Sequence, residues 1–549
     1  MIGVIASRSE NDIAGEFFEL FKTPWEFFRE DRSYDVILTT GDDIPKTDTK
    51  LVIMYGAGQN RFDHKIALKV TSHRKNTVLE CNGRSFPVYE SIVTFSGHGR
   101  PLLRLKGSGE AAGVEISTAH NRILRIGFNL FKEIRFLLSA GQPPDHASFP
   151  TLDIHIDLLR SWIVSSGIPL IEVPPVPEGY NFTVCLTHDV DFAGIRRHRL
   201  DHTMLGFIYR ALIFSCVDVI KKRKTCATLL RNWKSVLLLP LVYLGIVDDF
   251  WLLFDRYIEI EDGLASTFYM VPFKNRAGKD GSGAGQAHRR RAVRYDANDL
   301  RPHIQKLIAA GCEVGLHGID AWRDPEKGRQ EREHILHITG NPAAGLRMHW
   351  LFYDSHTPRV LDTAGFAYDS TVGYNEAVGY KAGTAQVYRP LTAETLFELP
   401  MHIQDTALFY PGQMNLSEAE AGELANTMIE KAETYGGALT INWHHRSIGP
   451  ERCWDGFYIR LLESLKKRKA WFATGTQIVN WFKKRRSVSF DKADFNGNTL
   501  QVKLSAQEGN DLPGLVLRVH MPEKSDTKVK DWKRIDMPFN GELNTSISL

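Results

Sequence analysis

Residues 182–191 read FTVCLTHDVD, an apolar run that ends in a histidine and two carboxylates. Three later stretches have the same form, an apolar run followed by imidazole or guanidinium side chains: CEVGLHG (312–318), GLRMH (345–349) and ALTINWHHR (438–446). The carboxyl ends of parallel strands collect the catalytic groups of open α/β sheets and barrels. Carboxylates, histidines and an arginine gathered at such an edge indicate a metal-assisted hydrolase.

Strand-like and helical segments alternate from residue 182 to about residue 486. Strand-like runs occupy 182–186, 265–271, 312–316, 438–441 and 470–474, and helical periodicity is clearest over 299–310 and 417–435. Parallel β/α architecture requires this alternation. We therefore predict a β/α catalytic domain over residues 180–486.

The two flanking regions have different patterns. Residues 1–150 open with strand-like and amphipathic runs and become more β-rich toward their end, which predicts a small α/β domain of unknown role. Prolines between residues 143 and 177 predict that the boundary lies between about 145 and 180. Beyond residue 486 apolar residues alternate with period two, so residues 487–549 are predicted to form a β-rich C-terminal appendix.

The composition limits the possible functions. The chain has 549 residues, of which 43% are hydrophobic, and this is an ordinary globular composition. A formal net charge of +3 is too small to indicate a nucleic-acid partner, because phosphate binding needs clustered charge. The opening stretch MIGVIASR reaches polar residues too early for a secretory signal peptide, so we expect a cytoplasmic protein.

Residues 196–247 interrupt the β/α pattern. They contain two basic clusters, RRHR (196–199) and KKRK (221–224), and the apolar run VLLLPLVYL (236–244). This run is shorter than the ~20 residues that a spanning helix needs. Two interpretations stay open, namely a buried helix and a peripheral contact with an anionic membrane or a lipid-linked substrate.

Asp189 and Asp191 are the first candidates for chemistry. One carboxylate of such a pair can bind a cation while the other acts as a base. An Asp-x-Asp pair also forms turns and helix caps, so it is not specific by itself. His317 stands between glycines after a strand-like run, where an imidazole could bind a metal, although a lone histidine is more often structural.

In combination these motifs resemble those of the polysaccharide deacetylase family, the NodB-like enzymes that remove acetyl groups from N-acetylated sugars. The resemblance covers about residues 180–485 and implies a distorted (β/α) barrel. The stretch THDVD is similar to the family's Asp-Asp motif, which implies that Asp189 is the catalytic base and Asp191 a metal ligand.

The family's second motif, His-x-x-x-His, is only half present. GCEVGLH matches its first half, which implies that His317 is a metal ligand, but Ala321 stands where the second histidine is expected. Alanine cannot bind a metal, so the ligand set needs a replacement. We expect His349 to supply it.

Two further motifs imply catalytic roles. GLRMH resembles the family's Arg-x-Pro motif, which implies that Arg347 orients Asp189 and lowers its pKa. The run LTINWH is similar to the family's last motif, a strand that ends in Leu-x-His, which implies that His444 is the general acid in preference to His445.

Three neighbouring residues, Trp443, His402 and Asp405, are candidates for substrate binding, and a carboxylate such as Asp405 could also support another site residue. The resemblance implies a divalent cation held by Asp191, His317 and His349. Zinc is the first candidate for this ligand set, and nickel and cobalt fit it as well.

The resemblance thus implies a metal-dependent carbohydrate N-deacetylase whose substrate is an acetylated sugar in a polysaccharide or its cytoplasmic precursor. The oligomeric state stays open. Two alternatives are retained. One is a catalytically degenerate protein that binds a glycan or a carrier-linked sugar, and the other is a hydrolase of a different non-peptide C–N bond, because fold does not determine substrate.

Overall fold

A computed structural model describes residues 1–45, 48–117, 121–221, 223–282, 285–342, 345–496, 499–507, 509, 511–522 and 532–548. The chain forms two compact units. The first contains Met1–Glu178, Tyr380–Leu391 and Trp481–Leu549, and the second contains Gly179–Gly379 and Thr392–Asn480. Lys222, which belongs to the second basic cluster, lies outside the described residues.

The first unit is built on a mixed sheet. Among the described residues its strands follow the order β2-β1-β3-β4-β11-β10-β9-β6-β7, and β8 pairs with both β10 and β5. The strands from β2 to β11 in this order run parallel, and the pairing is antiparallel from β10 onward. The strands are β1 (Ile2–Ile5), β2 (Trp25–Phe27), β3 (Val36–Thr39), β4 (Leu51–Tyr55), β5 (Lys69–Arg74), β6 (Thr77–Cys81), β7 (Arg84–Val88), β8 (Ile92–Ser96), β9 (Arg100–Leu105), β10 (Ala111–Ser117) and β11 (Arg122–Ile126). The helices are α1 (Asn11–Phe21), α2 (Arg61–Lys65), α3 (Leu130–Ser139) and α4 (Thr151–Ser165).

The C-terminal residues form two antiparallel groups of strands that contact-based division places with the first unit. β22 (Ser489–Asn496), β23 (Thr499–Ser505) and β26 (Glu542–Ser548) form one group, and β24 (Leu515–Met521) and β25 (Lys533–Phe539) form the other with β12 (Leu170–Glu172). The appendix therefore shares a sheet with an earlier segment of the chain.

One segment from within the predicted catalytic domain, Tyr380–Leu391, also belongs to the first unit. The backbone N–H of Tyr380 donates to the carbonyl of Ala147, and the N–H of Leu152 donates to the carbonyl of Gly383, each over 2.8 Å. The boundaries thus differ from the predicted 180–486 domain because this segment is bonded to the connection before α4 and to the first turn of α4.

The second unit is a distorted (β/α) barrel, as predicted. Its parallel strands follow the order β18-β17-β16-β15-β14-β13-β20-β19, and β21 pairs with the beginning of β13. The predicted strands are confirmed, and β13 is buried along its whole length, as a strand covered on both faces should be. The strands are β13 (Phe182–Val190), β14 (Ser266–Met270), β15 (Glu313–Gly318), β16 (Leu346–Met348), β17 (Tyr368–Asp369), β18 (Phe397–Glu398), β19 (Ile403–Gln404), β20 (Ala438–Asn442) and β21 (Ala470–Phe472).

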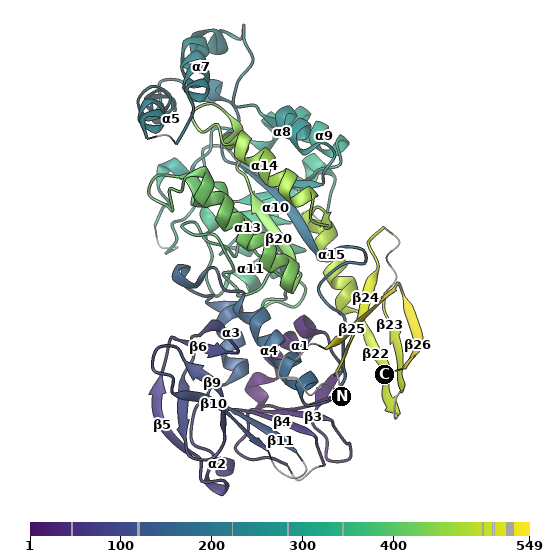
Figure 1. The fold of residues 1–549 in the computed structure, drawn as a ribbon. Coiled ribbons are helices and arrows are strands. Elements are labelled where there is room, and N and C mark those ends of the chain that lie inside the picture. Colours follow the sequence, from purple (N-terminus) through teal and green to yellow (C-terminus); the bar gives the residue numbers. More distant parts are fainter. Residues whose placement is uncertain are drawn as a thin grey trace. The chain divides into compact units, whose positions relative to one another are not determined.

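Residues 399–402, which connect β18 to β19, join the two edges of this sheet. The N–H of Met401 donates to the carbonyl of Val372, and the N–H of His402 donates to the carbonyl of Thr440. Helices cover the outside, with α13 and α14 lying across β20 in Figure 1. The helices are α8 (Phe254–Glu261), α9 (Arg301–Ala309), α10 (Pro325–Thr339), α11 (Thr357–Thr363), α12 (Asp405–Phe409), α13 (Glu418–Tyr435), α14 (Asp455–Lys466) and α15 (Gly475–Arg486), which crosses the boundary between the units.

The insertion forms a helical hairpin. Its first arm runs through α5 (His202–Tyr209), a π-helical turn (Arg210–Phe214) and α6 (Ser215–Ile220), and its second arm is α7 (Cys226–Leu244). Among the described residues, His202–Ile220 has the length and the mean hydropathy, 1.7, of a membrane span, and 28% of it is buried. Length and composition alone are weak evidence for a span, because the core helix of a water-soluble domain meets the same criteria.

Gly345 precedes β16, the strand that carries two predicted site residues. A Cβ added at Gly345 would lie 2.0 Å from the ring of Tyr368, a fully buried tyrosine. We expect Gly345→Ala to lower the free energy of unfolding by about 1–3 kcal/mol, the usual cost of overpacking a core. Urea denaturation followed by circular dichroism measures this. Gly422→Ala in α13, where an added Cβ meets open space, is the matched control and should be neutral or stabilising.

Candidate active site

The carboxyl ends of neighbouring barrel strands bring the predicted residues together. Asp189 lies at the end of β13 and Asp191 follows it, His317 lies in β15, and Arg347 lies in β16. β15 and β16 are paired so that His317 stands opposite Arg347. His349 comes directly after β16 and His444 two residues after the end of β20, so both extend the same edge.

Asp191, His317 and His349 form a potential metal-binding group. One ligand atom from each residue lies within 4.8 Å of the other two. The distance from Asp191 Oδ1 is 3.3 Å to His317 Nε2 and 3.5 Å to His349 Nδ1. Both imidazoles are almost fully buried, whereas the carboxylate is partly exposed.

The protonation of this group fits a cation. His317 Nδ1–H donates to the carbonyl of Arg347 over 2.9 Å, so a neutral His317 directs the lone pair of Nε2 toward Asp191. Burial lowers the pKa of His349 to about 3, which keeps that imidazole neutral at neutral pH. Burial acts to raise the pKa of Asp191, but the surrounding imidazoles, His349 first, outweigh it and hold the pKa far below its usual value.

Within the described part of the chain, Asp191 Oδ1 is buried and accepts no hydrogen bond. A buried, ionised oxygen without a partner is costly unless a cation satisfies it. Two imidazole nitrogens and one carboxylate oxygen are a typical ligand set of a catalytic zinc ion, which keeps further coordination positions for water and substrate. The residues present therefore fit a divalent cation.

Packing explains why position 321 is an alanine. Ala321 is fully buried beneath α10, and a Cβ built at Gly328 of that helix would already lie 3.5 Å from Ala321 Cα. The loop after β15 thus has little space for an imidazole. His349 instead lies two residues beyond the pairing partner of His317, and the two imidazole centroids are 4.8 Å apart.

Asp189 is held by two donors. Arg347 Nη1 donates to Asp189 Oδ1, and Asn442 Nδ2 donates to Asp189 Oδ2, each over 2.9 Å. Arg347 is fully buried and also donates to Thr187 Oγ1 and to the carbonyl and hydroxyl of Ser370. Burial acts to raise the pKa of Asp189, but the charge of Arg347 outweighs it and the pKa is lowered. Asp189 is therefore an ionised carboxylate at neutral pH.

His444 is paired with a buried carboxylate. Its Nδ1 lies 2.6 Å from Asp405 Oδ1, its backbone N–H donates to Asp405 Oδ2 over 2.8 Å, and its Nε2 lies 3.7 Å from Asp191 Oδ2. Burial acts to lower the pKa of His444, but the charge of Asp405 and the hydrogen bond to it raise the pKa to about 9. His444 is thus protonated at neutral pH and directs an N–H toward the cluster.

Three of the expected residues have other positions. Trp443 is fully buried and stacks on Phe457, with ring centroids 5.8 Å apart, so it lies in the core and not at a surface that substrate reaches. His402 is also buried, and its Nδ1 accepts from the N–H of Thr440. Asp405 is fully buried behind His444 and orients that imidazole. The geometry thus gives none of the three a direct contact with substrate.

His445 has no nitrogen available for chemistry. Its Nε2 accepts from the N–H of Leu253, and its Nδ1–H donates to the carbonyl of Phe192. Burial lowers the pKa of His445 to about 3. Of the adjacent pair, His444 is therefore the one that faces the cluster.

A pocket of about 600 Å³ opens beside Asp191 and His349. Its lining includes the exposed side chains of Arg289, Arg290 and Arg294 and the half-exposed indole of Trp350. Trp350 has a φ of +66°, a left-handed conformation that costs a non-glycine residue free energy. The sequence interpretation missed these four residues, although the basic run HRRRAVR (288–294) was an available signal for the three arginines.

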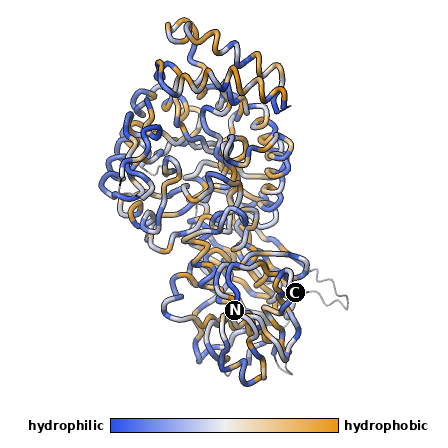
Figure 2. Tube along the Cα trace, turned by 90° about the vertical axis from the view of Figure 1, so that its left-hand side faces the viewer, coloured by the Kyte–Doolittle hydropathy of each residue, from blue (hydrophilic) through white to orange (hydrophobic). Residues whose placement is uncertain are grey.

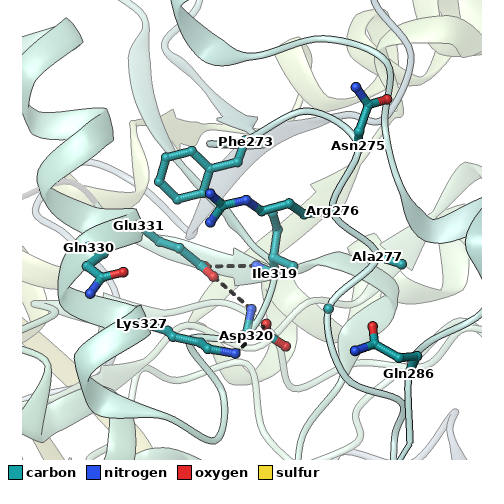
Figure 3. A pocket seen from close by; sticks show the side chains of 11 residues that line it. Phe273, Asn275, Arg276, Ala277, Gln286, Ile319, Asp320, Lys327, Gln330 and Glu331 are labelled. Atoms are coloured by element: carbon teal, nitrogen blue, oxygen red, sulfur yellow. Dashed lines mark hydrogen bonds and ion pairs between the residues drawn. The ribbon is translucent and has the colours of Figure 1, made fainter.

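A smaller hollow of about 340 Å³ shares Asn275, Ala277 and Gln286 with this pocket (Figure 3). Figure 3 shows Glu331 of α10 directed at the loop after β15, where its carboxylate accepts from the backbone N–H groups of Ile319 and Asp320. Burial raises the pKa of Glu331 to about 7. These bonds hold the loop that directly follows His317.

Asn442 is the site residue that sequence reasoning missed most clearly. Besides Asp189, its side chain contacts Gln404 Oε1 over 3.2 Å, so it joins two strand ends. Its position two residues before His444 is the available signal, because alternate residues of a strand face the same side.

No family model matches the sequence, and no curated protein matches it. Several solved structures are similar. A polysaccharide deacetylase from Mycobacterium smegmatis has 20% identity and a TM-score of 0.35, over 57% of this chain and 95% of that one. A polysaccharide deacetylase from Pseudomonas aeruginosa PAO1 has 14% identity and a TM-score of 0.33, over 58% and 95% of the two chains. PuuE allantoinase has 15% identity and a TM-score of 0.32, over 56% and 92%.

Proposed function

We propose that this protein is a metal-dependent hydrolase that removes the N-acetyl group from an acetylated sugar. One observation carries the proposal, namely that ligand atoms of Asp191, His317 and His349 lie close together, while Asp189 Oδ2 lies 4.0 Å from His317 Nε2 and His444 Nε2 lies 3.7 Å from Asp191 Oδ2. A divalent cation held by the first three residues, zinc as the first candidate, would supply a Lewis acid for amide hydrolysis.

The other residues of the cluster can divide the proton transfers. Asp189 is ionised and fixed by Arg347 and Asn442, so it can accept a proton from the attacking water. The water oxygen bonds to the acetyl carbon, and the C–N bond breaks. His444 is protonated through Asp405 and can give its proton to the leaving nitrogen. The products are acetate and a free amino sugar.

Release of acetate tests the proposal directly. The purified protein with added zinc should release acetate, together with an equal amount of new amine, from N-acetylglucosamine derivatives, and chelation should stop both. Hydrolysis of small cyclic amides in place of acetylated sugars would overturn the choice of substrate. Tight sugar binding without acetate release would favour a non-catalytic protein.

The pH dependence should report on the pair of Asp405 and His444. A general acid must be protonated, so activity should be present below its pKa and be lost as the pH rises through about 9. In Asp405→Asn the largest raising influence disappears, while burial and the smaller raising influence of Asp191 and Asp189 remain, so the pKa of His444 should fall. We expect the alkaline limb of kcat/KM to move by at least two pH units toward acid.

The matched control for this experiment is Glu261→Gln. Glu261 Oε1 lies 2.7 Å from His188 Nε2, another buried carboxylate and imidazole pair in the same unit that the proposed mechanism does not use. The alkaline limb of kcat/KM in Glu261→Gln should stay at the wild-type pH. An unchanged limb in Asp405→Asn would show that His444 is not the group that titrates.

The cationic pocket predicts a negatively charged substrate. Each hydrogen bond between a guanidinium and a phosphate is worth about 1.5–3 kcal/mol. We therefore expect the double variant Arg289→Ala/Arg290→Ala to raise KM for UDP-N-acetylglucosamine about 100-fold and to change KM for a neutral N-acetylglucosamine oligomer less than threefold. Steady-state kinetics on both substrates measures this. Arg276→Ala, which removes an arginine that lies over the Phe273 ring in the smaller hollow, is the control.

A further inference from the structure

The insertion hairpin exposes many large apolar residues on its outer face. On α7, Leu230, Trp233, Leu237, Leu241 and Leu244 recur every three or four residues, so they form one stripe along the helix. They are 64%, 41%, 79%, 37% and 72% exposed. Figure 2 shows hydrophobic residues along both arms of the hairpin. A water-soluble helix normally has the opposite arrangement.

The inner face of α7 combines polar and apolar residues, and its contacts are specific. Asn232 is fully buried, its Nδ2 donates to Ser215 Oγ over 2.7 Å, and its Oδ1 accepts from the N–H of Glu451. Farther along, Leu239 and Val242 pack with Phe207 and Trp251 in one buried cluster. The hairpin is therefore fixed to the barrel by specific contacts of its inner face. Its apolar outer face takes no part in these contacts.

The first arm repeats the pattern. Leu205, Tyr209, Ile213 and Ile220 are exposed, at 57%, 55%, 52% and 80%, whereas Met204, Phe207 and Ala211 are buried on the opposite side. Large contiguous apolar surfaces of this kind are rare on monomeric proteins and mark sites of interaction.

The charge of the hairpin indicates which partner covers this surface. Residues 199–247 contain eight lysines and arginines and two aspartates, so this segment has a net charge of +6, against +3 for the whole chain. Lys221 and Arg223 are exposed at the turn, and Lys234 is exposed beside the stripe of α7, whereas Arg231 pairs with Asp455 of α14. An apolar helix face bordered by basic residues is typical of helices that lie in the interface of an anionic bilayer.

We propose that this hairpin face, the apolar stripes of the two arms with their basic border, binds the surface of an anionic phospholipid bilayer. The hairpin lies in the interface and does not span the membrane, because its inner face is bonded to the barrel through Asn232 and the cluster around Trp251. Trp233, half exposed within the stripe, suits the headgroup level, where indoles are enriched.

The position of the hairpin connects it to the proposed active site. His202 and Thr203, the first residues of α5, line the pocket that contains Asp191 and the three arginines. A bilayer bound to the hairpin would therefore lie next to the pocket. This step rests on the proposed function, and it favours an acetylated sugar joined through phosphate to a membrane lipid.

Vesicle flotation tests the docking surface independently of catalysis. The full chain should float with vesicles of 30% phosphatidylglycerol in phosphatidylcholine and at least ten times less with phosphatidylcholine alone, and 0.5 M salt should weaken the binding. Leu237→Asn/Leu244→Asn should lower the partition coefficient at least tenfold, because two highly exposed leucines no longer enter the bilayer. Ile308→Asn, at an exposed apolar residue of α9, is the matched control.

Three results would overturn the proposal. The wild type does not float with the vesicles, or the double leucine variant floats as well as the wild type, or the bound protein resists carbonate extraction. The last result would indicate a hairpin that spans the membrane. Self-association that depends on Leu237 and Leu244, without vesicle binding, would assign the face to a second copy of the chain. Acetate release from a dissolved substrate should be the same in the wild type and in Leu237→Asn/Leu244→Asn. Failure of membrane docking and failure of the proposed function are therefore distinguishable.

Discussion

Replacing Asp189 with asparagine should lower kcat by about 10³-fold, within the range that a general base contributes. Asparagine has nearly the same shape but cannot accept the proton from water. The effect should appear in kcat, because the base acts in the transition state and does not hold the ground-state substrate. Acetate release under saturating substrate measures it.

Two controls separate this loss from a structural effect. Arg347 and Asn442 both donate hydrogen bonds to Asp189. The NH2 group of an asparagine at position 189 would therefore face one of these two donors, which costs some stability. The metal content should stay near the wild-type value, and the unfolding midpoint should show how much stability is lost. Activity within tenfold of the wild type would contradict the assignment of Asp189 as the base.

The second large effect concerns the metal ligands. Asp191→Ala, His317→Ala and His349→Ala should each lose most of the bound divalent metal, because a site with three protein ligands cannot lose one without a large fall in affinity. Elemental analysis of the purified variants measures this, and acetate release should fall in parallel. His334→Ala, which removes an imidazole that pairs with Asp296 away from the cluster, is the matched control and should retain its metal.

The three variants also test the unusual part of the ligand set. A protein that lost metal in His317→Ala and kept it in His349→Ala would show that His349 is a neighbour and not a ligand. In that case Ala321 would mark a site with fewer protein ligands, and the non-catalytic alternative would gain support.

Much of the barrel could be predicted from sequence, because its strands are buried on both faces and so appear as continuous apolar runs. Polar side chains begin near the ends of β13 and β20, and this placed Asp189, Asp191 and His444 at one edge of the predicted sheet. His317 lies in β15 and His349 directly follows β16, and the sequence alone does not show that these two strands pair. The proximity of the two histidines was therefore a hypothesis. The register of β15 and β16, which places His317 opposite Arg347, explains it.

The errors at the end of β20 have a simple physical cause. Successive residues of a strand face opposite sides, so Asn442 and His444 point to the cluster while Trp443 packs on Phe457 in the core. An aromatic residue next to a candidate catalytic histidine is a reasonable candidate for substrate binding, but a shift of one residue decides whether the side chain faces the pocket or the core. Trp350, the indole that does line the pocket, follows a strand end in a left-handed turn that no local pattern predicts.

The insertion shows a different limit of sequence reasoning. An apolar run such as VLLLPLVYL has the same composition in a buried helix and in one whose outer face is exposed, so both interpretations stayed open. The structure shows both kinds of position on α7, because Leu239 and Val242 are buried while the leucines of its outer stripe are exposed.

Anomalous diffraction from crystals grown with zinc tests the central claim most directly. The account predicts one strong peak at the zinc edge, about 2.0–2.2 Å from a carboxylate oxygen of Asp191 and from one ring nitrogen each of His317 and His349. Absence of a peak at saturating zinc, or a peak that lies beyond bonding distance of His349, would contradict it.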